Sequence, residues 1–333
     1  MGLYDGTTEN GSVATLPLSK SAPAIETDEQ TTDAAVNVTA ALLDLVSRSK
    51  GKIDPAQLAS IERRVSALES RPPTTITFAH GEWTSPKIEN ARPELIEIVR
   101  RVRAGFNNVW VAGPAGSGKT TLAKSLADAL GLSFGFQSFN ATSSTGDLIG
   151  TPTADGRWIE SAFIQCYENG GVYLLDELDA ASGEIVLAIN AALANGHLSI
   201  PRHPDASRRI ITRHKDCVVV AAGNTWGTGP DAQYVGRSQL DAATLDRFTG
   251  ARFTIGYDDT LEERILPDPA LLEMVRRMRK LCEENRIRRI IGTRSVVAAA
   301  KMHAAGFSPK EVYNALTEGW TTQDLAKMAG VLA

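Results

Sequence analysis

The sequence predicts an α/β protein in which a parallel five-stranded sheet is flanked by helices and followed by a small all-helical domain. Its 333 residues correspond to about two domains, and 43% hydrophobic with 22% charged residues is ordinary for a globular chain. This composition excludes a wholly disordered, collagen-like or coiled-coil protein. From Arg92 to about Gly256, apolar β-like runs alternate with helical patterns, and from Leu261 onward the β pattern disappears.

The N-terminal part of the chain has a different pattern. Residues 1–31 contain few large apolar residues, so we expect a disordered arm or one that a partner orders. Residues 32–75 are expected to form a helical extension, with one pattern at 36–46 and a second at 55–70. The second pattern spans only about two heptads, so docking on the core or on a neighbouring subunit is favoured over an isolated coiled coil.

We assign residues 76–256 to the α/β core and residues 257–333 to the helical domain. A short strand-like run at 74–78 precedes the five core strands, which are expected at 109–112, 134–139, 172–175, 218–222 and 251–255. The helical domain shows clear helix starts. At one of them, Ser308, Pro309 and Glu311 have the spacing of an N-cap, a first helical residue and a capping-box partner.

Charge and cysteine content restrict the partners and the compartment. A net charge of -4 offers no overall positive field for a polyanion, so nucleic acid is not the expected partner. Cys166, Cys217 and Cys282 lack the close spacing of a metal or redox motif, so they are expected to be buried thiols in a reducing compartment, with no structural metal. Neither a leader nor an apolar stretch long enough to span a membrane is present, so we expect a cytoplasmic protein.

The strongest functional signal is the run Gly113-Pro-Ala-Gly-Ser-Gly-Lys119-Thr120, a complete GxxxxGK[ST] between an apolar strand and a helical pattern. Glycines let successive backbone N–H groups surround phosphate oxygens, and the helix N-terminus adds positive potential. Lys119 is expected to contact the β and γ phosphates, and Thr120 to be a ligand of Mg²⁺. The predicted nucleotide-binding residues are Gly113, Pro114, Ala115, Gly116, Ser117, Gly118, Lys119, Thr120 and Thr121.

Two further strands end in polar side chains. Asp176 and Glu177 follow the strand at 172–175, at the sheet edge where open α/β proteins bind ligands. Asp176 is expected to hold Mg²⁺ through water, and Glu177 to polarise the attacking water. Asn224 follows the strand at 218–222 and is suited to orient that water.

In these ordered motifs the chain resembles the AAA+ ATPases, in particular the dynein-related branch with the MoxR-type chaperones and CobS, the ATPase subunit of cobaltochelatase. The run 155–163 resembles the insert that this branch carries in its second helix. Residues 195–201 and 208–212 resemble its hairpin before sensor 1, and residues 222–237 and 240–248 are similar to the CobS pattern. The resemblance implies a P-loop NTPase AAA+ core with a C-terminal helical lid.

The same resemblance implies an oligomeric ring, usually a hexamer, with ATP and Mg²⁺ bound between subunits. Arg247 would be the arginine finger that contacts the γ-phosphate of the neighbouring subunit, with Arg237 and Arg252 as rivals. Arg294, in the segment Gly-Thr-Arg-Ser that opens a lid helix, would be the sensor 2 arginine.

The expected function is therefore hydrolysis of ATP to ADP and phosphate, coupled to remodelling or assembly of a protein partner. CobS-like chains often occur beside a von Willebrand factor A protein, which makes such a protein a candidate client. The alternatives are a nucleotide-gated scaffold with incidental turnover and a DNA-linked motor.

Each of two surface features allows two interpretations. A basic cluster at 276–289 is interrupted by Glu283 and Glu284 and lacks aromatic residues, which favours a solvated lid face over a nucleic-acid site. The segments 151–158 and 197–212 are expected either to grip a client in the pore or to pack between subunits.

Overall fold

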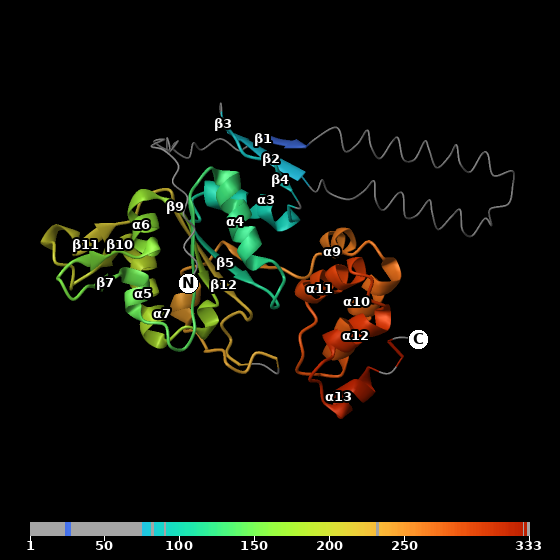
Figure 1. Cartoon of the computed structure of the whole chain (residues 1–333). Coiled ribbons are helices and arrows are strands. Elements are labelled where there is room, and N and C mark those ends of the chain that lie inside the picture. Colours follow the sequence, from blue (N-terminus) through green and yellow to red (C-terminus); the bar gives the residue numbers. More distant parts are fainter. Residues whose placement is uncertain are drawn as a thin grey trace.

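A computed structural model describes residues 24–27, 75–80, 83–89, 91–230, 233–328 and 330–331 (Figure 1). Within the predicted disordered arm, Ala24–Thr27 forms strand β1, which pairs antiparallel with β2 (Thr75–His80). The prediction of disorder is wrong for these residues, because the backbone of β1 finds hydrogen-bond partners in β2. The rest of the arm, and the helical extension except for Thr75 in β2, lie outside the described residues.

All five predicted core strands are confirmed and form one parallel sheet. Its order is β13 (Arg252–Thr254), β5 (Asn108–Ala112), β12 (Cys217–Gly223), β9 (Gly171–Asp176) and β6 (Phe134–Ser138). The short strands β3 (Trp83–Thr84) and β4 (Ile88–Glu89) pair with β2 in a separate sheet beside it. Because β5, β12 and β9 are adjacent and parallel, the chain segments that leave their carboxyl ends lie next to one another.

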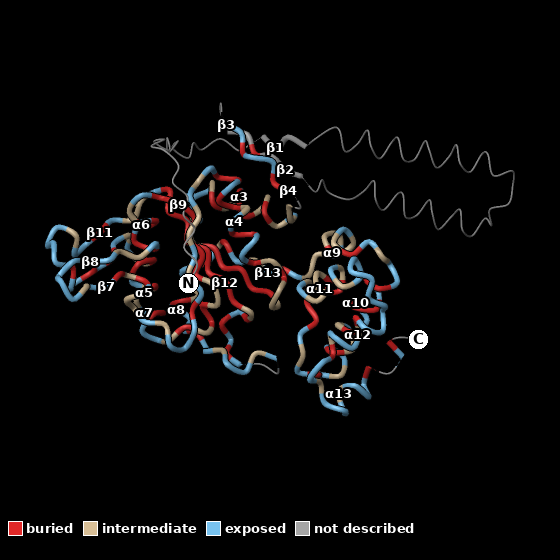
Figure 2. Tube along the Cα trace, in the orientation of Figure 1, coloured by how far each residue is buried: buried red, intermediate tan, exposed pale blue. Residues whose placement is uncertain are grey.

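Alternating side chains of the sheet enter two separate apolar layers, as expected for strands buried on both faces. Val109 and Val111 pack with α3 (Pro93–Arg103) and α4 (Lys119–Leu130). Trp110 packs on the other face, with α5 (Thr145–Ile149), α6 (Ala162–Asn169) and α7 (Gly183–Asn195). Figure 2 shows the buried strands between these helical layers.

Both predicted inserts are β-hairpins. The first, β7 (Thr151–Pro152) with β8 (Trp158–Ile159), separates α5 from α6, and the second pairs β10 (His197–Ser199) with β11 (Ile210–Thr212). The hairpins are connected: Arg208 lies 2.5 Å from Glu160, and the rings of Trp158 and His203 are 5.1 Å apart.

The lid consists of α9 (Asp259–Ile265), α10 (Pro269–Glu284), α11 (Thr293–Ala304), α12 (Pro309–Leu316) and α13 (Thr322–Lys327), with a core of its own. The predicted capping box of Ser308 and Glu311 opens α12. Among the helices of the described residues, none is long and apolar enough to cross a bilayer. Cys166, Cys217 and Cys282 are free and buried, as predicted.

The basic cluster of the lid departs from its prediction as a solvated face. Arg276 and Arg279 turn inward and contact Glu262, a fully buried carboxylate on α9. Arg279 also lies over the ring of Tyr257, 3.9 Å from its centroid. These two arginines stabilise the packing of α9 on α10, because burial of Glu262 requires a counter-charge.

Candidate nucleotide site

The phosphate-binding loop connects β5 to α4, at the carboxyl edge of the sheet. Gly118 has φ +91° and is the N-cap of α4, a conformation that residues with a Cβ rarely adopt. Gly113 packs so closely against Ile255, the residue after β13, that a Cβ there would lie 2.4 Å from the Ile255 carbonyl oxygen. The glycine spacing of the motif therefore meets two demands of the fold, a left-handed turn and a close backbone approach.

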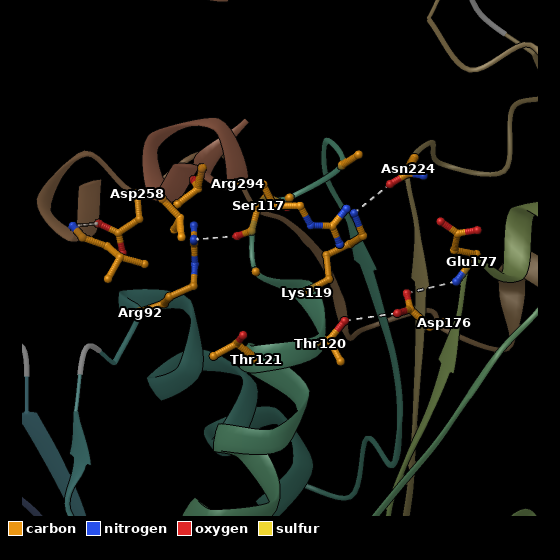
Figure 3. Close-up of a pocket in the computed structure, with 16 residues that line it drawn as sticks. Arg92, Ser117, Lys119, Thr120, Thr121, Asp176, Glu177, Asn224, Asp258 and Arg294 are labelled. Carbon is orange, nitrogen blue, oxygen red and sulfur yellow. Dashed lines mark hydrogen bonds between the residues drawn. The ribbon is translucent and has the colours of Figure 1, made fainter. Parts of the chain in front are cut away.

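A cavity of about 410 Å³ lies over this loop, between the core and the lid (Figure 3). It brings together most of the predicted nucleotide site with Asp176 and Glu177 at the end of β9, Asn224 and Arg294. Its lining consists of Arg92, Ala115, Gly116, Ser117, Gly118, Lys119, Thr120, Thr121, Asp176, Glu177, Asn224, Asp258, Leu261, Thr293, Arg294 and Val297.

Lys119 is the buried cation of the site. Its Nζ donates to the carbonyl oxygens of Gly113 (2.7 Å) and Pro114 (3.0 Å) and to Oδ1 of Asn224 (2.8 Å). Burial lowers the pKa of Lys119 to about 8, and the charges of the nearby carboxylates oppose this shift. The ammonium thus already contacts the sensor candidate Asn224, as Figure 3 shows.

Thr120 and Asp176 meet at the mouth of the cavity, where Oγ1 of Thr120 donates to Oδ2 of Asp176 over 3.1 Å. A hydroxyl and a carboxylate are oxygen donors of the kind that Mg²⁺ prefers, with water and phosphate oxygens completing its shell. These residues therefore fit a magnesium ion, as the sequence predicts.

Glu177 follows directly after Asp176 with φ +57°, an uncommon left-handed conformation for a residue with a Cβ. Its backbone N–H donates to Oδ1 of Asp176 (3.0 Å), and its side chain is 43% exposed. Such backbone outliers persist where the surroundings hold them and often mark functional positions. Glu177 lines the cavity, so its carboxylate could reach a water near the phosphates of a nucleotide.

Asp179, two residues further on, is fully buried and was not predicted as a site residue. Its Oδ2 accepts from the backbone N–H groups of Asn224 and Thr225, both at 3.0 Å, and from the Thr225 hydroxyl at 3.1 Å. This carboxylate fixes the end of β12 relative to β9, so it sets the position of Asn224. The sequence signal was a third acidic residue in the run Asp-Glu-Leu-Asp.

The lid contributes Arg294, as predicted. A Cβ on Gly116 would lie 3.6 Å from Cγ of Arg294, so this arginine covers the phosphate-binding loop. The hydroxyl of Tyr257, at the start of the lid, donates to the carbonyl oxygen of Ala115 (3.3 Å). Core and lid therefore form the cavity jointly.

Arg92 was missed by the sequence analysis, because it precedes the core motifs and belongs to none of them. Its guanidinium donates to the carbonyl oxygens of Ser117 and Gly256, both at 3.0 Å. It thereby connects the phosphate-binding loop to the segment that leads into the lid. Leu261 and Val297 add an apolar patch to the same cavity.

The three finger candidates lie in different places. Arg247 ends α8 (Ala242–Asp246) away from the cavity, exposed, and its guanidinium has no hydrogen-bond or ion-pair partner among the described residues. Arg252 is on the edge strand β13 and donates to the Thr249 hydroxyl (3.2 Å). Arg237 instead pairs with two carboxylates of the same chain, with its guanidinium 3.5 Å from Glu177 and 3.3 Å from Asp179. Its position does not favour the rival role of a finger toward a neighbour.

The fold is a P-loop AAA+ core with a C-terminal helical domain. Residues 108–248 match the family model of the AAA domain, dynein-related subfamily, which supports the AAA+ ATPases as the class of this protein. Among solved structures, a mutant RuvB of Thermotoga maritima is similar at 17% identity, over 65% of this chain and 72% of that chain, with a TM-score of 0.37. None of the curated proteins matches the chain significantly.

Proposed function

We propose that this protein is a Mg²⁺-dependent ATPase that hydrolyses ATP to ADP and phosphate. The observation that carries the proposal is the convergence of Lys119, the Thr120–Asp176 pair, Glu177, Asn224 and Arg294 on one cavity. Cations, oxygen donors for a metal and a partly exposed carboxylate are the groups that phosphoryl transfer to water needs.

Each group of residues at the cavity has a separate role in the proposed reaction. The backbone N–H groups of the loop and Lys119 bind the β and γ phosphates, and Asn224 orients the water that Glu177 polarises. A magnesium ion at Thr120 and Asp176 would neutralise phosphate charge. Arg294 would contact the phosphates from the lid, so that domain closure follows nucleotide binding.

We further propose that the chain forms a ring of about six subunits of the MoxR/CobS-like type in the cytoplasm. This ring would remodel a protein partner, and the candidate partner is a von Willebrand factor A domain protein. The exposed position of Arg247 suits a finger toward the neighbouring subunit. The two connected hairpins, with Ile159 and Ile210 exposed, offer apolar surface for a partner.

The test compares the unmodified chain with Lys119→Ala, Glu177→Gln and Arg247→Ala. Lys119→Ala is expected to weaken Mg-ATP binding about 10- to 100-fold, since a buried charged donor is lost. Glu177→Gln should bind Mg-ATP normally while phosphate release falls at least about 100-fold. Normal phosphate release by the Glu177→Gln protein would contradict the assignment of the base.

Ring formation is tested by the solution mass of the Glu177→Gln protein with and without Mg-ATP. A shift to about six subunits supports the ring, and Arg247→Ala should then reduce turnover about 10³-fold without weakening nucleotide binding. A mass of one subunit under both conditions would contradict a nucleotide-dependent ring.

A further inference from the structure

The segment between β12 and α8 folds back on itself beside the nucleotide site. We call residues 225–230 and 233–240 the strap. The strap is held to itself by a β-bridge between Thr228 and Gln239 and by the hydrogen bond from the Leu240 N–H to the Gly227 carbonyl (2.9 Å). Leu240 is buried in the core, so the end of the strap is anchored.

The strap contacts both the phosphate-binding loop and the turn that follows β9. The backbone N–H of Ala115, in the phosphate-binding loop, donates to the hydroxyl of Tyr234 (2.9 Å). The backbone N–H of Ser238 donates to the carbonyl oxygen of Asp179 (2.7 Å), just after β9. Arg237 lies between these two attachment points, so its place is fixed on both sides.

The side chain of Arg237 is only 13% exposed and faces two carboxylates from the same turn. Nη1 lies 3.3 Å from Oδ1 of Asp179, and Nη2 lies 3.5 Å from Oε1 of Glu177. Asp179 is fully buried and fixed by three other donors from Asn224 and Thr225. The guanidinium therefore has a rigid anchor on one side and the carboxylate of the proposed base on the other.

This arrangement restricts the side-chain conformations of Glu177. A side chain that is 43% exposed samples several rotamers, and only some of them place its carboxylate where a water can be polarised. A planar guanidinium restricts those rotamers, because Asp179 holds Nη1 and thereby fixes the Nη2 that faces Glu177. A displacement of about 1 Å can cost about 100-fold in rate.

We propose that Arg237 is a positioning residue for ATP hydrolysis that acts within its own subunit and orients Glu177. The proposal rests on the proposed function, and it separates Arg237 from the role of a finger. Through Asp179, the same contact network also fixes Asn224, so the strap sets the two groups that face the attacking water.

The first test measures turnover and Mg-ATP binding in the full chain with Arg237→Ala and Arg237→Lys. Arg237→Ala should lower kcat about 10- to 100-fold while the Kd for Mg-ATP stays within about twofold, since the phosphate-binding loop is untouched. Arg237→Lys keeps the charge and should recover part of kcat. Arg100→Ala, which removes an exposed arginine paired with Glu97 on α3, is the matched control and should leave both values unchanged.

Thermal unfolding followed by circular dichroism checks that Arg237→Ala is folded. A normal kcat for Arg237→Ala would overturn the proposal, and so would a loss of Mg-ATP binding in the folded Arg237→Lys protein. No turnover by the unmodified chain would instead refute the proposed function, on which this inference depends.

A second test separates action within the subunit from action on a neighbour. A copy with Arg237→Ala is joined by a flexible linker to a copy with Glu177→Gln, which still carries Arg237. If Arg237 acts within its own subunit, the linked protein stays at the rate of Arg237→Ala alone, because neither copy has a complete site. Recovery of turnover in the linked protein would show that Arg237 is supplied by a neighbour and would overturn the proposal.

Discussion

The buried carboxylate of the lid offers the most quantitative test of the structure. Glu262 is fully buried and accepts from Nη2 of Arg279 (2.6 Å) and from the hydroxyl of Thr293 (2.8 Å), with Nε of Arg276 at 3.4 Å. It joins α9, α10 and α11. The change Glu262→Gln keeps the shape of the side chain but removes the charge, so both arginines lose their shared counter-ion.

Breaking a buried ion pair by removing one partner costs about 3–5 kcal/mol of unfolding free energy. Arg276 keeps Asp259 nearby, and Arg279 keeps the Ile291 carbonyl and the Tyr257 ring, so the low end applies. We therefore expect a loss of about 3 kcal/mol, which lowers the midpoint of lid unfolding by about 12–24 °C for a domain of this size.

The assay is urea and thermal unfolding followed by circular dichroism. Glu284→Gln is the matched control, because Glu284 forms only an exposed pair with Lys280 (3.8 Å) and such pairs contribute about 0–1 kcal/mol. A Glu262→Gln protein that unfolds at the same midpoint as Glu284→Gln would refute the reasoning. Weaker Mg-ATP binding by Glu262→Gln should accompany the loss, since Thr293 precedes Arg294.

Three further outcomes follow from single contacts. Gly113→Ala should weaken Mg-ATP binding by at least about tenfold in equilibrium titration, because the new Cβ would lie 2.4 Å from the Ile255 carbonyl oxygen. Gly183→Ala is the control, because Gly183 has open space around it. Equal affinities of the two variants for Mg-ATP would contradict the close packing at Gly113. Tyr167→Phe removes the hydroxyl that donates to the Ala192 carbonyl (2.7 Å) and should cost about 1–2 kcal/mol in urea unfolding; an unchanged midpoint would argue against that buried hydrogen bond. Burial raises the pKa of Cys282 to about 11, so iodoacetamide should label it at pH 8 only after unfolding, whereas fast labelling of the folded protein would contradict its burial. Because the folded pKa lies above the unfolded value, the stability that this thiol contributes is complete below about pH 8 and is lost as the pH rises toward 11.

The sequence predicted the parts of the site that occupy short continuous runs. The phosphate-binding loop, the pair Asp176 and Glu177, and Asn224 each follow an apolar strand directly, and parallel strands bring their ends to one sheet edge. Their proximity therefore follows from the order of the strands alone.

The remaining contacts depend on the path of the chain between elements. Nothing local in the sequence shows that the strap folds back, so Arg237 was predicted only as a rival arginine finger and not as a partner of Glu177. Arg279 meets Glu262 only because α9 and α10 pack together, and this is why the basic cluster was mistaken for a solvated face. Local periodicity carries no information about such pairings.

The hydrogen bonds of Arg92 have a consequence for mechanical coupling. One guanidinium donates to Ser117, beside the bound phosphates of the proposed reaction, and to Gly256, where the chain leaves the core. A tilt of the lid that moves Gly256 must therefore stretch or break a contact that also supports the phosphate-binding loop. By thermodynamic linkage, whatever force a partner exerts on the lid changes the affinity for nucleotide, and the nucleotide changes the work of tilting the lid by the same free energy.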